Sequence, residues 1–378
     1  MKIVVAPDSF KGSLSAREVT RTMVQAVQRV IPDCRIDEVP IADGGEGTVD
    51  CLVAATGGQI VKVPVRDPLG RTVDGSYGLL PDGTCVIEVA AAAGLTMVKD
   101  AERDILRQSS YGVGQLIAHA LEAGHTSFVV GLGGSATNDA GAGMLEALGV
   151  RFFDALHQSV PGTPEGLLNL QSVDLTGIHP GLAQAEIRVA CDVNNPLCGP
   201  NGASAIFGPQ KGATEELIPV LDRALDRFAG VVESQTGTAF REMEGAGAAG
   251  GLGGAFAGVL GARLIQGIDL VLDVVDFNRR LQGADLVLTG EGRTDGQTMQ
   301  GKAVFGIGRR AREASVPVFC ISGAVTPDAR ALYDLGVTAL FAIPNGPLSL
   351  PECLDRAGEL LADAVESAVR AFVAGHSS

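Results

Sequence analysis

The chain has 378 residues, of which 46% are hydrophobic and 19% are charged, so it can bury a large core and is not an intrinsically disordered protein. Its net charge of −15 excludes nucleic acids and anionic membrane surfaces as expected partners. At roughly 100 to 200 residues per domain, the length predicts two domains or one large domain.

The sequence also bears on the cellular compartment. No apolar run reaches the ~20 residues that a membrane helix needs. The N-terminal segment MKIVVAPDSFKGS becomes polar too early for a secretory signal. The 7 cysteines are scattered and form no C-x-x-C pair, which favours neither a disulfide framework nor a zinc ribbon. We therefore expect a cytoplasmic protein that is a monomer or a homodimer.

The first 60 residues alternate between buried strands and helices. Ser15 and Glu18 stand three positions apart, as a capping box at a helix start requires. The predicted elements are a strand over 3–6, a helix over 15–30, a strand over 35–42 and a helix over 48–55. This order is β-α-β-α.

The middle of the chain differs from the start. Turn signals at Pro68-Leu69-Gly70 and Pro81-Asp82-Gly83 predict antiparallel hairpins, and helices with long glycine-rich loops follow them. Two further strands, over 128–131 and 187–191, each run into a polar loop.

The C-terminal region returns to strands that alternate with helices. The predicted elements are strands over 285–289, 316–322 and 339–343, and helices over 303–314, 327–335 and 350–373. Short apolar strands separated by helices indicate a parallel sheet with helices on both faces. We predict a discontinuous Rossmann-like α/β domain, residues 1–60 and 281–378, with a second α/β domain over 61–280 inserted into it.

Ligands of parallel sheets bind where the strands end, and three strand ends of the first domain carry polar loops. Five acids and two bases are expected to meet there: Asp8, Asp43, Glu46, Glu291, Asp295, Lys11 and Arg293. Acids gathered in this way repel one another unless a cation lies among them. Mg²⁺ with a polyphosphate satisfies both signs of charge, because acids hold the metal and Lys or Arg holds phosphate. The alternative for each loop is an Asp or Ser that caps a helix.

Two glycine motifs fail as nucleotide signatures. Residues 296–303 resemble a Walker A loop, but Ala303 replaces the Ser or Thr that binds Mg²⁺. Lys302, at a predicted helix start, still suits a phosphate. Residues 245–250 match G-x-G-x-x-G but follow no strand, which argues against a nicotinamide-dependent oxidoreductase.

The inserted domain offers two candidate loops. The strand over 128–131 leads into Gly133, Gly134 and Ser135, a set suited to binding an anion through N–H and hydroxyl groups. The alternative is a glycine turn that only allows close helix packing. The second loop begins at Asp192, for which a base, a metal ligand and a turn former are all open.

Eight segments resemble the type-1 glycerate kinases, in that family's order and over nearly the whole chain. They are PDSFKGSLSA (7–16), PIADGGEGT (40–48), SYGVGQLI (110–117), GLGGSATND (131–139), ACDVNNPL (190–197), FGPQKGA (207–213), GAGAAGGLG (245–253) and LTGEGRTDGQ (288–297). The resemblance implies a two-domain α/β enzyme, with its active site in the cleft between the domains, that transfers the γ-phosphoryl group of MgATP to D-glycerate. In bacterial relatives the product is generally 2-phospho-D-glycerate.

The resemblance supports site residues from both predicted domains. From these and the loop chemistry we expect catalytic roles for Asp192 as the base, Lys11 and Arg293. Substrate or phosphate binding is expected from Asp8, Ser9, Ser135, Asn138, Asp139, Asn194 and Lys302, and metal binding from Asp43, Glu46, Glu291 and Asp295. The alternatives are transfer to the 3-hydroxyl, another small hydroxy acid as the acceptor, and a non-catalytic protein that binds a carboxylate.

Overall fold

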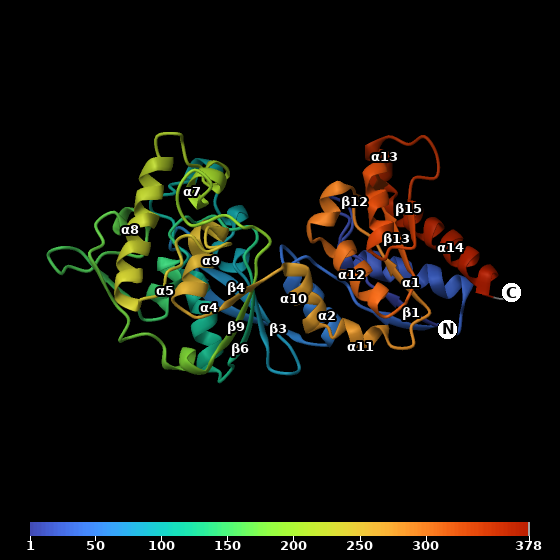
Figure 1. Cartoon of the computed structure of the whole chain (residues 1–378), viewed down its shortest axis with the longest axis horizontal. Helices are drawn as coiled ribbons and strands as arrows, with labels where there is room; N and C mark the ends of the chain where they lie inside the picture. The colour runs from blue at the N-terminus through green and yellow to red at the C-terminus, as the bar shows by residue number, and fades with distance from the viewer. Residues whose placement is uncertain (377–378) are drawn as a thin grey trace. The chain divides into compact units, whose positions relative to one another are not determined.

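The computed structural model describes residues 1–376, which form two compact units (Figure 1). Unit 1 consists of Met1–Asp43, Asp50–Gly57 and the chain from Gly267 onward, and unit 2 consists of Gly44–Val49 and Gly58–Gln266. Within the described residues, no helix is both long and apolar enough to cross a membrane.

The unit boundaries differ from the predicted domain boundaries. Residues 267–280 were expected in the inserted domain, yet α10 (Gly267–Val274) and most of α11 (Phe277–Leu281) lie in that range and belong to unit 1. The reason is packing, because α10 lies directly on α12 (Ala303–Glu313) of unit 1. A Cβ built on Gly306 of α12 would lie 2.5 Å from Cγ1 of Ile268.

The sheet of unit 1 is wholly parallel, as predicted. Its strand order is β15-β13-β11-β1-β2, so the first strand of the chain lies beside a strand near the C-terminus. The strands are β1 (Lys2–Val5), β2 (Arg35–Glu38), β11 (Leu286–Thr289), β13 (Val318–Ser322) and β15 (Ala339–Ala342).

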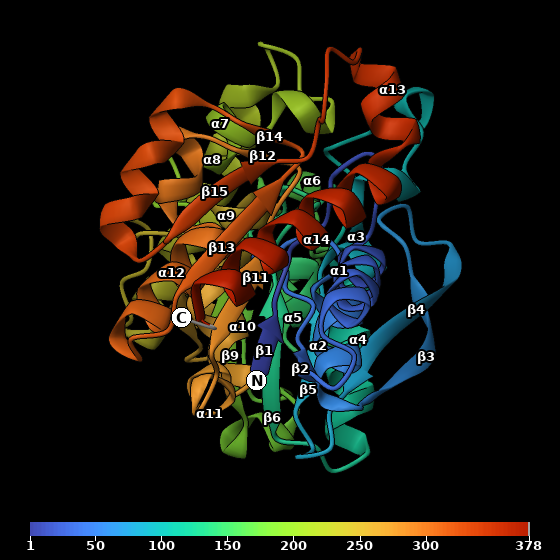
Figure 2. The ribbon, with the colours of Figure 1, turned by 90° about the vertical axis from the view of Figure 1, so that its right-hand side faces the viewer.

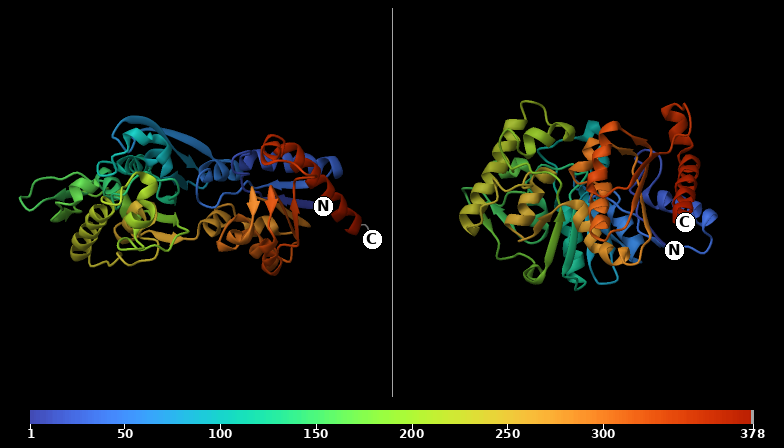
Figure 3. Two further views of the ribbon diagram at one scale, coloured as in Figure 1. Left: turned by 90° about the horizontal axis from the view of Figure 1, so that it is seen from above. Right: turned by 45° about the vertical axis from the view of Figure 1, so that its right-hand side comes forward.

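Helices cover both faces of this sheet. On one face, α1 (Ala16–Val30) and α14 (Ala357–His376) lie side by side (Figure 2) and bury Ile3 and Val5. On the other face lies α12 (Figure 3). The predicted capping box is present, because Ser15 and Glu18 exchange hydrogen bonds at the start of α1.

Three elements of unit 1 differ in extent or type from the prediction. The strand expected over 35–42 ends at Glu38, and the segment 327–335 is a 3₁₀ helix. The helix expected over 350–373 is split into α13 (Leu350–Asp355) and α14, because the backbone of Arg356 is not helical. The remaining elements are α2 (Thr48–Thr56), shared with unit 2, the 3₁₀ helix η5 (Gly296–Gln300), and the strands β12 (Arg293–Thr294) and β14 (Ala324–Val325).

Unit 2 has a mixed sheet of six strands in the order β10-β9-β6-β5-β4-β3. The two predicted hairpins are present, since β3 pairs with β4 and β4 with β5 in antiparallel fashion, while the other pairs are parallel. The strands are β3 (Gln59–Arg66), β4 (Thr72–Leu79), β5 (Cys85–Glu88), β6 (Ser127–Gly131), β9 (Glu186–Ala190) and β10 (Arg263–Ile265).

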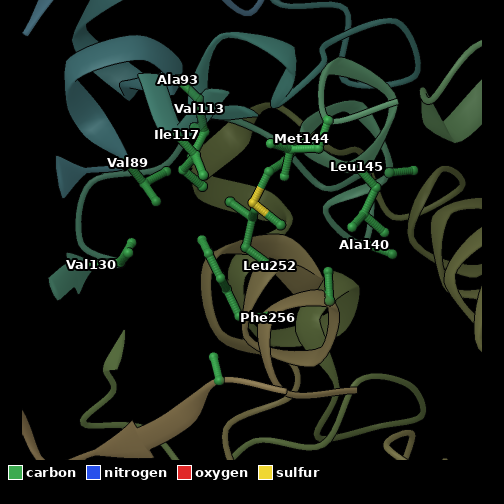
Figure 4. Packing of buried hydrophobic residues seen from close by; sticks show 14 of the residues in the cluster. Val89, Ala93, Val113, Ile117, Val130, Ala140, Met144, Leu145, Leu252 and Phe256 are labelled. Carbon is green, nitrogen blue, oxygen red and sulfur yellow. The ribbon is translucent and has the colours of Figure 1, made fainter. Parts of the chain in front are cut away.

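The core of unit 2 lies between this sheet and its helices. Ile117 and Met144 point toward Leu252 and Phe256 from different helices (Figure 4). The helices are α3 (Ala90–Ala93), α4 (Tyr111–Glu122), α5 (Ala142–Ala147), α6 (Pro164–Leu167), α7 (Ala203–Phe207), α8 (Ile218–Thr236) and α9 (Ala248–Gly258), and a separate hairpin joins β7 (Arg151–Phe153) to β8 (Ser172–Asp174).

Candidate active site

Three loops of unit 1 stay paired beyond the ends of their strands. The Asp8 N–H donates to the carbonyl of Gly290 at 2.9 Å, and the Ile41 N–H donates to the carbonyl of Pro7 at 2.9 Å. The loop after β1 is therefore held between the loops after β11 and β2. This arrangement brings the three loops together at the carboxyl ends of parallel strands, but Glu46, which was expected on the same rim, belongs to unit 2.

Three carboxylates of this rim interact: Asp8, Asp43 and Glu291. Burial, first of all, and then the charges of Asp43 and Glu291 raise the pKa of Asp8 to about 7. The Ser9 N–H donates to the Asp8 carboxylate and opposes this shift. A cation at this rim would therefore relieve the repulsion among these carboxylates.

Glu291 is part of a hydroxyl network under the rim. It is 6% exposed, and its Oε1 accepts hydrogen bonds from Thr298 Oγ1 at 2.7 Å and Thr294 Oγ1 at 3.1 Å. Burial raises the pKa of Glu291, while the two hydroxyls and the charge of Lys302 lower it. Lys302 immediately precedes α12, where it was expected.

Asp295 and Arg293 occupy the outer part of the same loop. Asp295 accepts the Gln297 N–H at 2.9 Å and so caps η5, which is the capping role considered for each polar loop. Its other oxygen lies 3.1 Å from Nε of the largely exposed Arg293. Lys11 is also exposed, in the loop after β1, and its backbone packs against Gly292.

The acids of unit 1 suit a magnesium ion that arrives with a nucleotide. Among the described residues, no group of three or more His, Cys, Asp and Glu side chains is arranged to hold a metal ion alone. Mg²⁺ is commonly bound through one or two carboxylates together with substrate phosphates. The carboxylate pair Asp8 and Asp43, with Glu291 beside it, supplies this kind of oxygen ligand.

In unit 2 the loop that follows β6 has the form of an anion-binding turn. Gly133 and Gly134 are exposed, and Gly134 has a φ of +71°, a left-handed conformation that favours glycine. Backbone hydrogen bonds hold this loop against the end of α3 and the residues that follow it. The Leu95 N–H donates to the Gly134 carbonyl and the Ala136 N–H donates to the Ala93 carbonyl, both at 2.8 Å.

Asp139 holds this loop rather than facing a ligand. Its carboxylate is fully buried and accepts hydrogen bonds from the Ser110 N–H and hydroxyl and from the N–H groups of Gly141 and Gly143. Three of these donors reach Oδ2 and the Gly141 N–H reaches Oδ1, so both oxygens are hydrogen-bonded within the protein. We therefore replace the expected substrate-binding role of Asp139 with a structural one.

Asn138 and Ser135 are buried as well. Asn138 is 0% exposed, and its Nδ2 donates to Ser204 Oγ at 2.9 Å, while its Oδ1 has no hydrogen-bond partner among the described residues. Ser135 is 7% exposed and accepts a hydrogen bond from Nζ of Lys211 at 2.9 Å.

Lys211 was not among the predicted site residues. Its side chain is 1% exposed, and its Nζ also donates to the carbonyl of Thr137 at 2.7 Å. Burial lowers the pKa of Lys211 to about 7, and the charge of Asp139 opposes that shift. The lysine lies 76 positions after Ser135, so sequence spacing does not connect them, although the segment FGPQKGA was noted within the resemblance.

The glycine-rich segment over 245–254 packs against this loop. Ala249, Gly250 and Gly251 all have positive φ, at +52°, +70° and +97°. The Ala140 N–H donates to the Gly250 carbonyl at 2.9 Å, and a Cβ on Gly250 would lie 2.0 Å from the Thr137 carbonyl oxygen. The G-x-G-x-x-G pattern therefore serves close backbone packing and not a dinucleotide.

Asp192 and Asn194 are exposed in the loop after β9, and Glu46 is exposed in the short part of unit 2 between β2 and α2. Parallel pairing of β5, β6 and β9 puts the Asp192 loop on the same rim of unit 2 as the Ser135 loop. That rim is accessible to a ligand through the exposed Asp192, Gly133 and Gly134.

Comparison with known proteins gives a consistent result. The model of the glycerate kinase family matches residues 3–373. The chain is 46% identical to the glycerate kinase of Bacillus subtilis, over 96% of this chain and 95% of that protein. It is 45% identical to the glycerate 2-kinase of Escherichia coli, over 91% of this chain and 90% of that protein.

A solved structure supports the same fold. The crystal structure assigned to glycerate kinase 2 of Salmonella typhimurium LT2 matches with a TM-score of 0.90 and 44% identity, over 100% of this chain and 99% of that chain. The protein is thus a kinase of the α/β class. It belongs to the glycerate kinase family.

Proposed function

We propose that the protein transfers the γ-phosphoryl group of ATP, bound with Mg²⁺, to the 2-hydroxyl of D-glycerate and releases ADP and 2-phospho-D-glycerate. The observation that carries the nucleotide part is the convergence of Asp8, Asp43 and Glu291 on one rim of unit 1. The choice of the 2-hydroxyl follows the name of the Escherichia coli relative, glycerate 2-kinase.

The residues of unit 1 suit the charges of phosphoryl transfer. Asp43 and Glu291, with Asp8, hold the magnesium ion, which neutralises charge on the phosphates. Lys11, Arg293 and Lys302 are cations on the same loops and bind phosphate oxygens. Asp295 orients Arg293 through their ion pair, and its binding to the metal stays a prediction.

The residues of unit 2 suit the acceptor. Asp192 is the proposed base that takes the proton from the attacking hydroxyl, with Asn194 beside it as a hydrogen-bonding partner for glycerate. The N–H groups of Gly133 and Gly134 and the Ser135 hydroxyl bind an anionic oxygen. The remaining proposed site residues are Ser9, in a polar loop of unit 1, and Glu46, in a polar loop of unit 2.

A product assay tests the proposal. The purified protein is incubated with ATP, Mg²⁺ and D-glycerate, ADP release is coupled to an optical assay, and the product is identified by phosphorus NMR. We expect 2-phospho-D-glycerate and loss of turnover in excess chelator. A 3-phosphoglycerate product would overturn the regiochemistry, and turnover of another hydroxy acid in preference to D-glycerate would overturn the substrate.

We further propose that the reaction takes place in the cytoplasm. All 7 cysteines are free thiols in the structure, including the partly exposed Cys34 and Cys353, which suits a reducing compartment. Fractionation of the source cells with an antibody against the protein tests this location. Size-exclusion chromatography with light scattering distinguishes the expected monomer from the homodimer.

A further inference from the structure

Lys211 is a cation enclosed in the interior of unit 2. It lies at the end of a short 3₁₀ turn over Pro209–Lys211, with 1% of its surface exposed. Transfer of an ammonium group out of water is costly unless it is paired or has a chemical task. Both oxygens to which its Nζ donates, Ser135 Oγ and the Thr137 carbonyl, are neutral. A buried apolar side chain would pack at this position at lower cost.

The two acceptors of Lys211 belong to one loop. Ser135 and Thr137 both lie in the turn after β6, whose Gly133 and Gly134 are exposed. Two other atoms of this loop, Thr137 Oγ1 and Asn138 Oδ1, are buried and have no partner among the described residues. The loop therefore has polar groups that a ligand or water would satisfy in the working enzyme.

The chemistry of lysine decides how Ser135 is used. In its protonated form, which the charge of Asp139 favours, Lys211 has three N–H donors and no acceptor, so Ser135 Oγ then accepts the hydrogen bond from Nζ. The hydroxyl hydrogen of Ser135 is then directed away from Lys211. A serine held in this way is a hydrogen-bond donor, which is what an anionic substrate oxygen requires.

A second group, Asp139, affects the charge of Lys211. Asp139 interacts with Lys211 through space and favours its charged form, while its carboxylate accepts hydrogen bonds from Ser110, Gly141 and Gly143. Lys211 Nζ itself donates to Ser135 Oγ and the Thr137 carbonyl of the loop. Arg103 packs on Gly212, the residue next to Lys211, and forms an ion pair with Asp100.

We propose that Lys211 is a positioning residue that fixes Ser135 as the hydrogen-bond donor to an anionic oxygen of a substrate, either the glycerate carboxylate or a phosphate. Lys211 does not touch the substrate in this assignment, because its side chain is enclosed. The inference rests on the proposed function, since it assumes that Ser135 binds a substrate of the kinase reaction.

A double-mutant cycle tests the assignment. We expect Lys211→Met to lower kcat/KM by about 10- to 100-fold, the range of a hydrogen bond to a charged group. In a Ser135→Ala background, Lys211→Met should cause no further loss, because the group that it positions is absent. Lys62→Met, at an exposed lysine on β3 of the same unit, is the control and should leave kcat/KM unchanged.

The same kinetics identify the ligand. If Ser135 binds the glycerate carboxylate, KM for D-glycerate rises in Lys211→Met and in Ser135→Ala while KM for MgATP does not. If Ser135 binds a phosphate, KM for MgATP rises instead. A purely structural role of Lys211 would lower the thermal unfolding temperature and the activity equally in both backgrounds.

The outcomes are separable from failure of the proposed function. No activity of the unchanged protein on D-glycerate would refute that function before the cycle is built. A second outcome is an active protein in which Lys211→Met lowers kcat/KM by the same factor with Ser135 present and in the Ser135→Ala background. That result would overturn the positioning role alone. If Lys211→Met does not fold, the cycle is run with Lys211→Gln, which removes the positive charge and keeps an amide donor group, and the same additivity would overturn the role.

Discussion

The loop regions that carry candidate site residues in the two units are built in opposite ways. In unit 1 the rim gathers like charges, Asp8, Asp43 and Glu291, whose repulsion helps to raise the pKa of Asp8. In unit 2 the loop after β6 gathers glycines and hydroxyls and places one cation, Lys211, beneath them. The first arrangement suits a cation that comes and goes with its nucleotide, and the second suits an anion that needs fixed donors.

The two loop regions lower the stability of the folded protein in different ways. The rim of unit 1 is destabilised by electrostatic repulsion among its carboxylates, which the proposed Mg²⁺ would relieve. The loop of unit 2 is destabilised by backbone strain and by the burial of a lysine, and the core packing of the unit compensates for both. Mutations at the first region should therefore act mainly on activity, whereas mutations at the second should act on activity and stability together.

The largest expected effect is at Asp192. Asp192→Asn keeps the shape of the side chain and removes its basicity, so kcat should fall by about 10²- to 10⁴-fold, as for loss of a general base. The dissociation constants of ATP and glycerate, measured by calorimetry, should barely change. The control is Glu186→Gln, at the opposite end of β9. A collapse of binding with the fold intact would make Asp192 a ligand-binding residue instead.

Next in size is Asp43 of unit 1. Asp43→Asn removes one rim charge, and kcat should fall by about 10²- to 10³-fold because magnesium is held less well in the transition state. Raising the Mg²⁺ concentration should restore part of the rate, which a turnover assay over a magnesium titration checks. Asp33→Asn, at an exposed position of the same unit, should show neither effect. A loss of rate independent of Mg²⁺ would remove Asp43 from the metal site.

A glycine comparison tests the strain in unit 2. Gly250→Ala adds a Cβ 2.0 Å from the Thr137 carbonyl oxygen at a φ of +70°, and should destabilise the protein by about 3 kcal/mol or more. Gly237→Ala has nearly the same φ, +73°, with nothing within 4 Å, and should cost only about 1 kcal/mol. Unfolding in urea measures both. Equal losses would show that the contact with Thr137 is unimportant.

Lys11 should have a moderate effect. Lys11→Met removes an exposed cation beside the acidic rim, and KM for MgATP should rise by about tenfold, the size of one lost charge-assisted hydrogen bond. Steady-state kinetics at fixed glycerate give this value, with Arg17→Met on α1 as the control. Unchanged kinetics would exclude Lys11 from substrate binding.

A further expected effect, on stability and not on activity, is a pH dependence of the free energy of unfolding. Burial lowers the pKa of Lys211 to about 7, below the value of 10.5 expected in the unfolded chain. Between pH 7 and 10.5 the unfolded state therefore holds more protons. The contribution of Lys211 to the free energy of unfolding should rise with pH by at most about 1.4 kcal/mol per pH unit.

Lys211→Met lacks this pH-dependent contribution. The free energy of unfolding of the unchanged protein minus that of Lys211→Met should therefore be larger at pH 9 than at pH 7. Urea titrations at both pH values measure the difference. A constant difference would mean that Lys211 keeps an ordinary pKa in the folded protein.

Local patterns predicted the fold well. Ser15 with Glu18 marked the start of α1, and the apolar run at the N-terminus marked β1 as a buried strand. The rim of unit 1 was also predictable, because the loops that follow parallel strands meet at one edge of a sheet. In each case the signal lies within a few neighbouring residues.

Other features depend on contacts between distant segments, which no local pattern encodes. Asp139 accepts two hydrogen bonds from Ser110, and Lys211 is enclosed against the loop that contains Ser135. The break of the final helix at Arg356, two residues before Gly358, was not predicted by the amphipathic pattern over 350–373. The extent of each unit likewise depended on packing, such as α10 on α12.

The pairing of β1 with β11 has a consequence for synthesis of the protein. Ile3 aligns with Leu286, so the first strand to leave the ribosome has no neighbour on that side until about three quarters of the chain are made. Unit 2 is translated in between and can fold first. A chain cut short before β11 would keep an open, apolar strand edge, which favours aggregation. Truncated products should therefore collect in the insoluble fraction of cell extracts.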